Sequence, residues 1–134
     1  MASIFTRIIN GEIPSYKVAE DENYYAFLDI NPLSKGHTLV VPKIEVDYIF
    51  DLDTDTYSGL WDFTRKLSTA VERTVDCKRI GLVVLGLEVP HAHVHIVPMN
   101  NEGDVDFRKP KLKLSAEEFE ELRLAIADSF NSLG

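Results

Sequence analysis

Seven consecutive residues, His91 to Val97, alternate histidine with apolar side chains in the segment HAHVHIV. Successive side chains of a β-strand point to opposite faces of a sheet. As a strand, this segment places its three histidines on one face and turns Ala92, Val94 and Ile96 to the other. We expect the apolar face to pack on the core. The chain should therefore fold around a sheet that displays a row of imidazoles.

The spacing of apolar residues elsewhere predicts three helices. Residues 3–10 carry a short helix-like pattern that Gly11 would terminate. Between residues 54 and 75 the apolar positions recur at three and four, which gives one apolar face on a long helix. Ser115 and Glu118 have the spacing of a capping box that opens a last helix. Residues 103–114, without a clear period, are expected to form a loop.

Runs of aromatic and β-branched residues predict the remaining strands, over residues 16–19, 24–29, 37–42 and 79–86, before the histidine strand at 91–98. Their short connections favour an antiparallel sheet over βαβ units. We therefore predict an α+β fold with a five-stranded antiparallel sheet, one long central helix and a C-terminal helix. At 134 residues the chain has the size of one ordinary domain, so residues 1–134 are assigned to a single domain.

Charge and hydropathy exclude two classes of partner. The chain has 14 Lys and Arg against 22 Asp and Glu, a net charge of −8 that repels a nucleic-acid backbone. No apolar run approaches the roughly 20 residues of a membrane span. The N-terminus MASIFTRIINGEIP lacks the pattern of a secretory signal. We expect a cytoplasmic protein that binds neither nucleic acid nor membrane.

Three interpretations of the histidine row are open from the residues alone. The rings could decorate the surface of an edge strand. Two imidazoles two residues apart could converge on zinc, but a further ligand would have to come from elsewhere, with His37 and Asp29 as candidates. A row of crowded rings kept partly neutral near pH 7 suits nucleophilic attack and proton transfer. The pattern favours the catalytic interpretation.

The segment HAHVHIV resembles the signature of the histidine triad superfamily of nucleotide hydrolases and transferases. The segments SIFTRIINGEIPS at 3–15 and AFLDINPLSKGHTLVVPK at 26–43 also resemble that family in order and spacing, over roughly the first hundred residues. The resemblance is to the nucleoside phosphoramidase and dinucleoside polyphosphate hydrolase branches. It implies hydrolysis at the α-phosphate of a purine nucleoside 5′-monophosphate derivative without a cofactor or metal. It also implies a homodimer whose sheets join into a wider sheet.

By this resemblance His93 is the nucleophile that forms a nucleotidyl-histidine intermediate, and a backbone carbonyl of its own strand fixes its tautomer. His91 and His95 would hold the geometry and the α-phosphate, and His37 matches a fourth family histidine near the phosphate. Asp29 matches a carboxylate that accepts bonds from both ribose hydroxyls, although an Asp at this place could simply cap the following turn.

An apolar slot for the base is implied at four residues that, taken singly, would be assigned to the core: Phe5, Ile8, Phe27 and Ile30. The sequence departs from the phosphoramidase pattern before the triad. The segment LGLEVP (85–90) is shorter than the family's glycine-rich loop and puts Leu87 and Glu88 where a polar pair would fall. Glu88 could donate a proton to the leaving group or repel an anionic one.

Two other functions stay open. The altered Leu87-Glu88 segment would suit a nucleotide-binding, regulatory module without turnover, whereas the intact triad speaks for an enzyme. A metal-dependent hydrolase would use His91 and His93 as ligands. The third triad position is His95 and not the Gln of the sugar-phosphate uridylyltransferase relatives, which favours hydrolysis over transfer.

Overall fold

The computed structural model describes residues 2–133. Their elements follow the predicted order, with two short 3-10 helices added. The elements are α1 (Ile4–Ile9), β1 (Lys17–Glu20), β2 (Tyr24–Leu28), β3 (Thr38–Pro42), η1 (Ile49–Asp51), α2 (Thr54–Thr74), β4 (Arg79–Val83), β5 (Val94–Met99), η2 (Glu102–Val105) and α3 (Ala116–Ser132).

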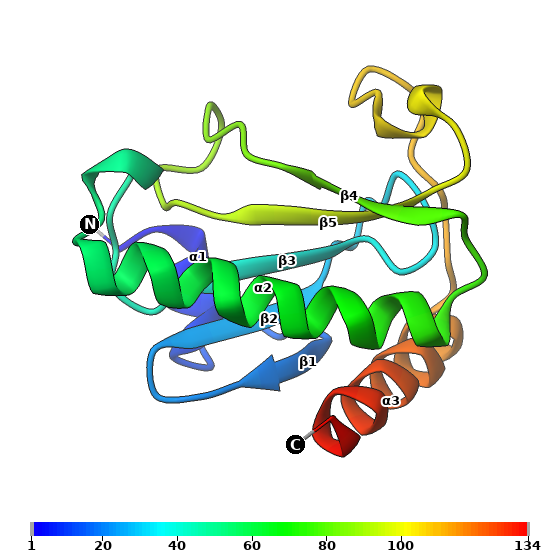
Figure 1. Ribbon diagram of the computed structural model, residues 1–134, viewed down its shortest axis with the longest axis horizontal. Coiled ribbons are helices and arrows are strands. Elements are labelled where there is room, and N and C mark those ends of the chain that lie inside the picture. Colours follow the sequence, from blue (N-terminus) through cyan, green and yellow to red (C-terminus); the bar gives the residue numbers. More distant parts are fainter. Residues whose placement is uncertain (1, 134) are drawn as a thin grey trace.

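The strands form one antiparallel sheet in the order β1-β2-β3-β5-β4 (Figure 1). The predicted α+β fold with a five-stranded antiparallel sheet is therefore confirmed. Strand β5 lies between β3 and β4, and its residues Val94 to Ile96 pair with β3. The third triad histidine, His95, faces Leu39 of β3 and Val83 of β4 in the register of the ladder.

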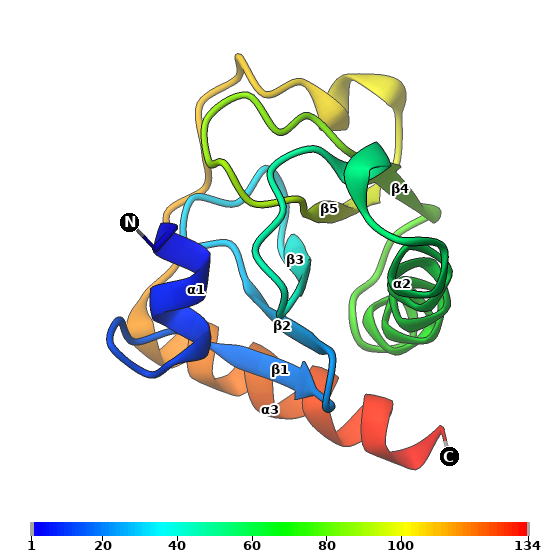
Figure 2. The ribbon, with the colours of Figure 1, turned by 90° about the vertical axis from the view of Figure 1, so that its left-hand side faces the viewer.

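Alternate residues of the strands enter two separate cores. Helices α2 and α3 pack on one face of the sheet, where the alternate residues Ala26, Leu28 and Val40 meet them. Helix α1 packs on the opposite face, against Phe27 and Leu39 (Figure 2). Because the side-chain period of a strand is two, one sheet can bury both of these surfaces.

The long helix and the last helix begin as their sequences predict. The side chain of Asp53 accepts a hydrogen bond from the Thr56 amide at the start of α2. The Ser115–Glu118 capping box is present at the start of α3, with both of its reciprocal hydrogen bonds. Caps of this kind satisfy amides that have no partner within the helix.

The boundaries predicted for the last two strands were wrong. Strand β4 ends at Val83, and β5 begins only at Val94, so His91 and His93 precede the regular strand. The reason is a change of partner, since the Ala92 amide donates to the carbonyl of Val46 at 2.7 Å. The alternation nevertheless continues through this stretch, because Ala92 is buried in the same core as Val94.

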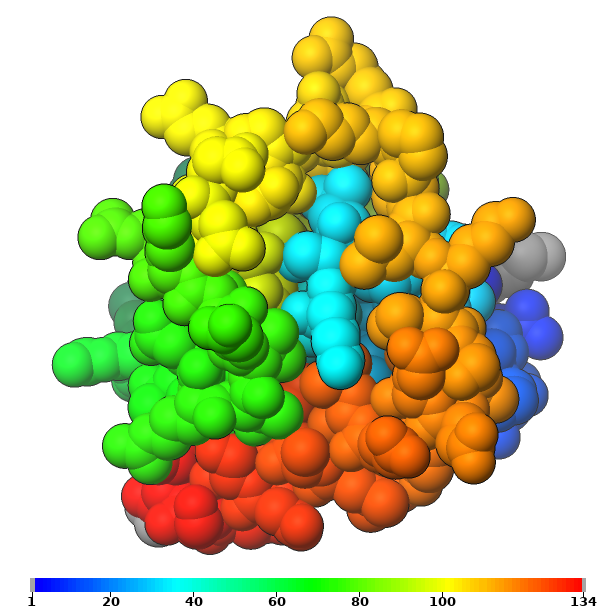
Figure 3. All heavy atoms as spheres, turned by 90° about the vertical axis from the view of Figure 1, so that its right-hand side faces the viewer, coloured from blue at the N-terminus to red at the C-terminus, as the bar shows by residue number. Residues whose placement is uncertain are grey.

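The segment after η2 crosses the end of the sheet before α3 begins. The amide of Leu112 donates to the carbonyl of Pro32 at 2.9 Å. In Figure 3 this segment (orange) lies beside the loop that precedes β3 (cyan). None of the helices within residues 2–133 has the length and apolar character needed to cross a membrane.

Candidate active site

A cleft of about 370 Å³ lies where the connection before β5, helix α1 and the segment after η2 meet. Two of the four histidines, His93 and His95, line it. The other lining residues are Phe5, Asp29, Asn31, Leu39, Leu85, Gly86, Leu87, Glu88, Val89, Phe107 and Lys111. A second cavity of about 360 Å³ shares His93 and residues 85–87 with the cleft and is lined by aromatic rings such as Tyr57 and Trp61.

The nitrogen that carries the hydrogen of the His93 ring determines which nitrogen has a free lone pair. Nδ1 of His93 lies 2.7 Å from the carbonyl oxygen of His91. A carbonyl only accepts, so Nδ1 of His93 carries the hydrogen and Nε2 of the neutral ring keeps its lone pair. This is the backbone contact that the sequence analysis anticipated. It gives His93 a nucleophilic nitrogen.

His91 lies behind His93 rather than in the cleft. Its ring is fully buried, and Nε2 lies 2.7 Å from the carbonyl oxygen of Pro42. It is absent from the residues that line the cleft. Of the roles expected for it, holding the geometry of the triad fits this placement, whereas direct contact with the α-phosphate does not.

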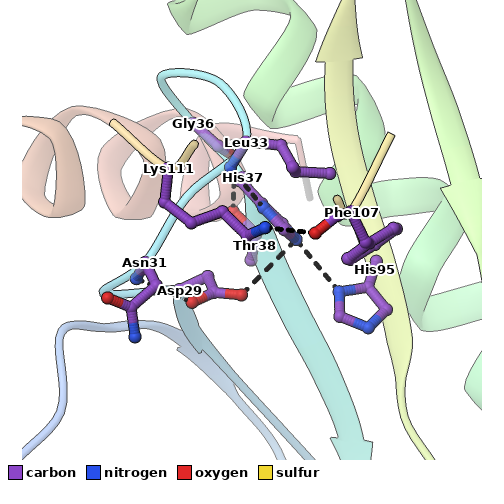
Figure 4. A network of polar contacts seen from close by, with 9 residues as sticks. All are labelled: Asp29, Asn31, Leu33, Gly36, His37, Thr38, His95, Phe107 and Lys111. Carbon is purple, nitrogen blue, oxygen red and sulfur yellow. Dashed lines mark hydrogen bonds and ion pairs between the residues drawn. The ribbon is translucent and has the colours of Figure 1, made fainter. Parts of the chain in front are cut away.

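His37 and His95 form a directed pair (Figure 4). The Leu33 amide donates to Nδ1 of His37 at 3.0 Å, so the hydrogen of His37 is on Nε2. Nε2 of His37 lies 3.0 Å from Nδ1 of His95 and donates to it. The hydrogen of His95 is therefore on its own Nε2. A lone pair on His93 and an N–H on His95 stand side by side, with ring centroids 5.0 Å apart.

Burial keeps these rings neutral. It lowers the pKa of His37 to about 4 and that of His95 to about 3, with the neighbouring positive charge of Lys111 or of the other histidines adding to the effect. Burial also lowers the pKa of His91 and of His93. Loss of solvent disfavours the charged form of each imidazole. At neutral pH the site therefore offers N–H donors and a free lone pair instead of imidazolium charges.

Asp29 makes the turn contact and also faces the histidines. Its Oδ1 accepts from the Asn31 amide at 2.8 Å, and its Oδ2 lies 3.6 Å from Nε2 of His37. Asp29 can therefore cap the turn with one carboxylate oxygen and face the cleft with the other, so the two roles considered for it are compatible. Burial raises the pKa of Asp29.

The proposed base-slot residues do not share one environment. Phe5, Ile8 and Phe27 are buried in the same small core, and Phe5 alone of these three lines the cleft, with its ring edge-on to His93 at 4.9 Å. Ile30 is 63% exposed and stands outside that core. Glu88 is exposed and belongs to the rim of the cleft.

Phe107 and Lys111 are two of the cleft residues that the sequence analysis did not assign to the site. Phe107 packs edge-on against His95, with ring centroids 4.8 Å apart, and Lys111 lies close enough to affect the pKa of both Asp29 and His37. Nζ of Lys111 donates to the carbonyl of Phe107, which orders the segment (Figure 4). The segment that contains them has no hydrophobic period, so no pattern in the sequence places either residue near the triad.

One group of possible metal ligands exists within residues 2–133. Single atoms of Asp29, His37 and His95 lie within 4.8 Å of one another. Coordination through Nε2 of His37 would move that ring's hydrogen to Nδ1, where the Leu33 amide already donates. Two donors would then face each other in a buried place. The donor set is therefore poorly suited to a metal, because the cost of an unmade buried hydrogen bond opposes it.

Comparison with known proteins agrees with this geometry. The HIT domain family model matches residues 10–102. The chain is 39% identical over 132 residues to an uncharacterized HIT-like protein of Borreliella burgdorferi, covering 92% of this chain and 95% of that protein. It is 34% identical over 125 residues to the adenosine 5′-monophosphoramidase of Schizosaccharomyces pombe, covering 91% of this chain and 93% of that enzyme.

The fold is similar to the crystal structure of a hypothetical histidine triad nucleotide-binding protein from Sulfolobus tokodaii. The TM-score is 0.82 and the identity 34%, covering 96% of this chain and 92% of that one. The family resemblance seen in the sequence is therefore confirmed by the family model, by full-length relatives and by the fold. The chain belongs to the HIT domain family.

Proposed function

We propose that this protein hydrolyses purine nucleoside 5′-monophosphate derivatives at the α-phosphorus through a nucleotidyl-His93 intermediate. The observation that supports this most is the pairing of a lone pair on Nε2 of His93 with an N–H on Nε2 of His95 in one cleft. The name of the relative from Schizosaccharomyces pombe, an adenosine 5′-monophosphoramidase, points to a phosphoramidate as a substrate class. A dinucleoside polyphosphate is the other.

The reaction would proceed in two displacements. Nε2 of His93 forms a bond to the α-phosphorus while the bond from phosphorus to the leaving group breaks, and the leaving group departs with the electron pair and takes up a proton. Water then forms a bond to phosphorus and gives up a proton to the solvent, which replaces the proton taken by the leaving group. The bond to Nε2 breaks, and the nucleoside 5′-monophosphate is released with His93 restored. The N–H of His95 donates to a phosphoryl oxygen or to the leaving atom as charge develops.

The rest of the cleft would hold the nucleotide. Oδ2 of Asp29 would accept hydrogen bonds from the ribose hydroxyls. Phe5 would supply apolar surface for the base, and Lys111 would place positive charge near the phosphate. The second cavity, which also reaches His93, gives a leaving group a place to lie. Glu88 lines the cleft and not this second cavity, so it would face the bound nucleotide.

Release of AMP from adenosine 5′-phosphoramidate and from diadenosine tetraphosphate tests the proposal. We expect turnover by the wild type and its loss in His93→Ala, together with an adenylyl group on His93 in acid-quenched samples analysed by mass spectrometry. AMP release that persists in His93→Ala would contradict the mechanism. Binding of AMP without any turnover would favour the non-catalytic module. Loss of turnover on adding a strong chelator would favour the metal-dependent hydrolase.

We further propose that the protein forms a homodimer through β4. This strand is an edge of the sheet, and Leu82 on it is 45% exposed. Antiparallel pairing of two such edges about a two-fold axis would join the sheets and cover Leu82. Light scattering on eluting protein should give twice the chain mass for the wild type and less for Leu82→Lys. A wild-type monomer would contradict this proposal without touching the hydrolysis.

A further inference from the structure

A cluster of polar side chains lies behind the triad, outside the cleft. Oγ of Ser3 lies 2.8 Å from Nδ1 of His91, and both residues are buried. Thr6 and Glu45 complete the cluster, because Glu45 accepts from the Thr6 hydroxyl at 2.6 Å and from the Ser3 amide at 2.7 Å. Three segments that are far apart in sequence thus meet at the first histidine of the triad.

The direction of each hydrogen bond follows from its neighbours. Nε2 of His91 donates to the Pro42 carbonyl, so Nδ1 of the neutral ring is an acceptor. The Thr6 hydroxyl donates to Glu45 and has no further hydrogen to give. The Ser3 hydroxyl accepts from the Thr6 amide at 3.1 Å, and two acceptors face its own hydrogen, Nδ1 of His91 at 2.8 Å and the Thr6 hydroxyl at 3.4 Å. The shorter contact is the one with His91. Ser3 is therefore the donor to Nδ1 of His91.

His91 is in turn the support of His93. Its carbonyl oxygen holds the Nδ1–H of His93, at 2.7 Å. The stretch from His91 to His93 has left the regular ladder, so few ladder bonds fix its backbone. The His91 ring is held between the Pro42 carbonyl on one side and the Ser3 hydroxyl on the other.

We propose that Ser3 is a positioning residue, whose hydroxyl holds the His91 ring and through the His91 carbonyl aims His93 at the substrate. Helix α1, whose N-cap is Ser3, then supports the triad in addition to packing on the sheet. The effect on turnover rests on the proposed hydrolysis, whereas the effect on the imidazoles does not.

Nuclear magnetic resonance of histidine labelled with ¹⁵N reads the imidazoles without activity. In Ser3→Gly we expect the Nδ1 resonance of His91 to move and the Nδ1–H of His93 to exchange faster with water. Glycine is a tolerated N-cap, so α1 should persist. Ser3→Thr keeps the hydroxyl and should keep both signals. Ser115→Gly removes the equivalent cap hydroxyl of α3 and should leave both unchanged.

Kinetics with adenosine 5′-phosphoramidate then reads the consequence. Ser3→Gly should lower kcat about tenfold, the low end of losses for residues that orient a site residue, with KM little changed. Ser3→Thr should restore kcat. Equal kcat values in Ser3→Gly and Ser3→Thr, or a His93 Nδ1–H that exchanges at the wild-type rate in Ser3→Gly, would overturn the inference. An inactive wild type with the expected resonance changes would overturn only the proposed hydrolysis.

Discussion

Nε2 of His37 lies 3.0 Å from Nδ1 of His95, although 58 positions separate the two residues in the sequence. The contact has one hydrogen between two nitrogens, and both rings are buried. A proton added to Nδ1 of His95 would place a second hydrogen in this space, and one added to Nδ1 of His37 would face the Leu33 amide that already donates there. Either proton would also put a charge in a medium with little water. The pair is therefore built to be neutral, which directs the N–H of His95 outward.

This neutrality predicts a loss of stability in acid. The folded pKa of His37, about 4, is below the usual value of 6.5, so the unfolded chain binds the proton more readily. The stabilising contribution is complete above the unfolded pKa and falls as the pH drops from there toward 4. From His37 alone, about 2 kcal/mol of the free energy of unfolding should be lost between roughly pH 7 and pH 5.

Urea unfolding at both pH values measures this for the wild type and for His37→Gln. Glutamine has no proton to bind in this range, so acidification should cost the variant less than the wild type by about 2 kcal/mol. Equal losses in the two proteins would mean that His37 does not take part in the pH dependence.

Asp29→Asn is predicted to weaken AMP binding selectively. Asparagine keeps an oxygen for the Asn31 amide but replaces the second acceptor with a donor. Loss of the bonds to the ribose hydroxyls should raise the Kd about 30-fold, or about 2 kcal/mol. Calorimetry with AMP and 2′,3′-dideoxy-AMP should show the loss for AMP only.

A matched control exists for this substitution. Asp21 makes the same type of turn, accepting from the Asn23 amide at 2.8 Å, and belongs to the turn between β1 and β2. Asp21→Asn should leave AMP affinity unchanged. A loss in Asp29→Asn that is equal for both nucleotides would assign the effect to the turn and remove the ribose contact.

Lys111→Met is predicted to weaken the hold on anionic substrates. The charge of Lys111 lies near Asp29 and His37 in a partly buried place, where screening by salt is weaker than at the surface. Its loss should raise the KM for diadenosine tetraphosphate about fivefold, or about 1 kcal/mol, and flatten the dependence of KM on salt. Lys113→Met, which neutralises an exposed residue two positions on, should change neither.

The sequence was sufficient for the parts of the fold that depend on local pattern. Helices α2 and α3, and the capping box at Ser115, follow from spacing that is visible in a single chain, whereas the cap at Asp53 was not predicted. The core face of the triad also followed, because Ala92 and Val94 alternate with histidine. These features need only the period of a helix or strand and the chemistry of an N-cap.

Such local patterns do not predict contacts between segments that are distant in the sequence. The late start of β5 goes with the bond from the Ala92 amide to the Val46 carbonyl, and no local feature of residues 91–93 predicts that partner. The place of Lys111 beside Asp29 depends on the path of a segment without periodicity. The Pro42 carbonyl that binds Nε2 of His91 is likewise a partner from a distant segment, which the alternation of histidines in the motif does not predict.

Ile30→Ala provides the sharpest test of the base slot. Ile30 is 63% exposed and stands outside both cores, so its truncation should change the free energy of unfolding by less than about 0.5 kcal/mol. If its side chain covers a bound purine, the Kd for AMP should rise about threefold, as expected for part of an apolar contact. Ribose 5-phosphate, which lacks the base, should bind the variant and the wild type equally in calorimetry. Equal weakening of both ligands would place Ile30 against the ribose or the backbone of the cleft, and unchanged AMP affinity would remove it from the site.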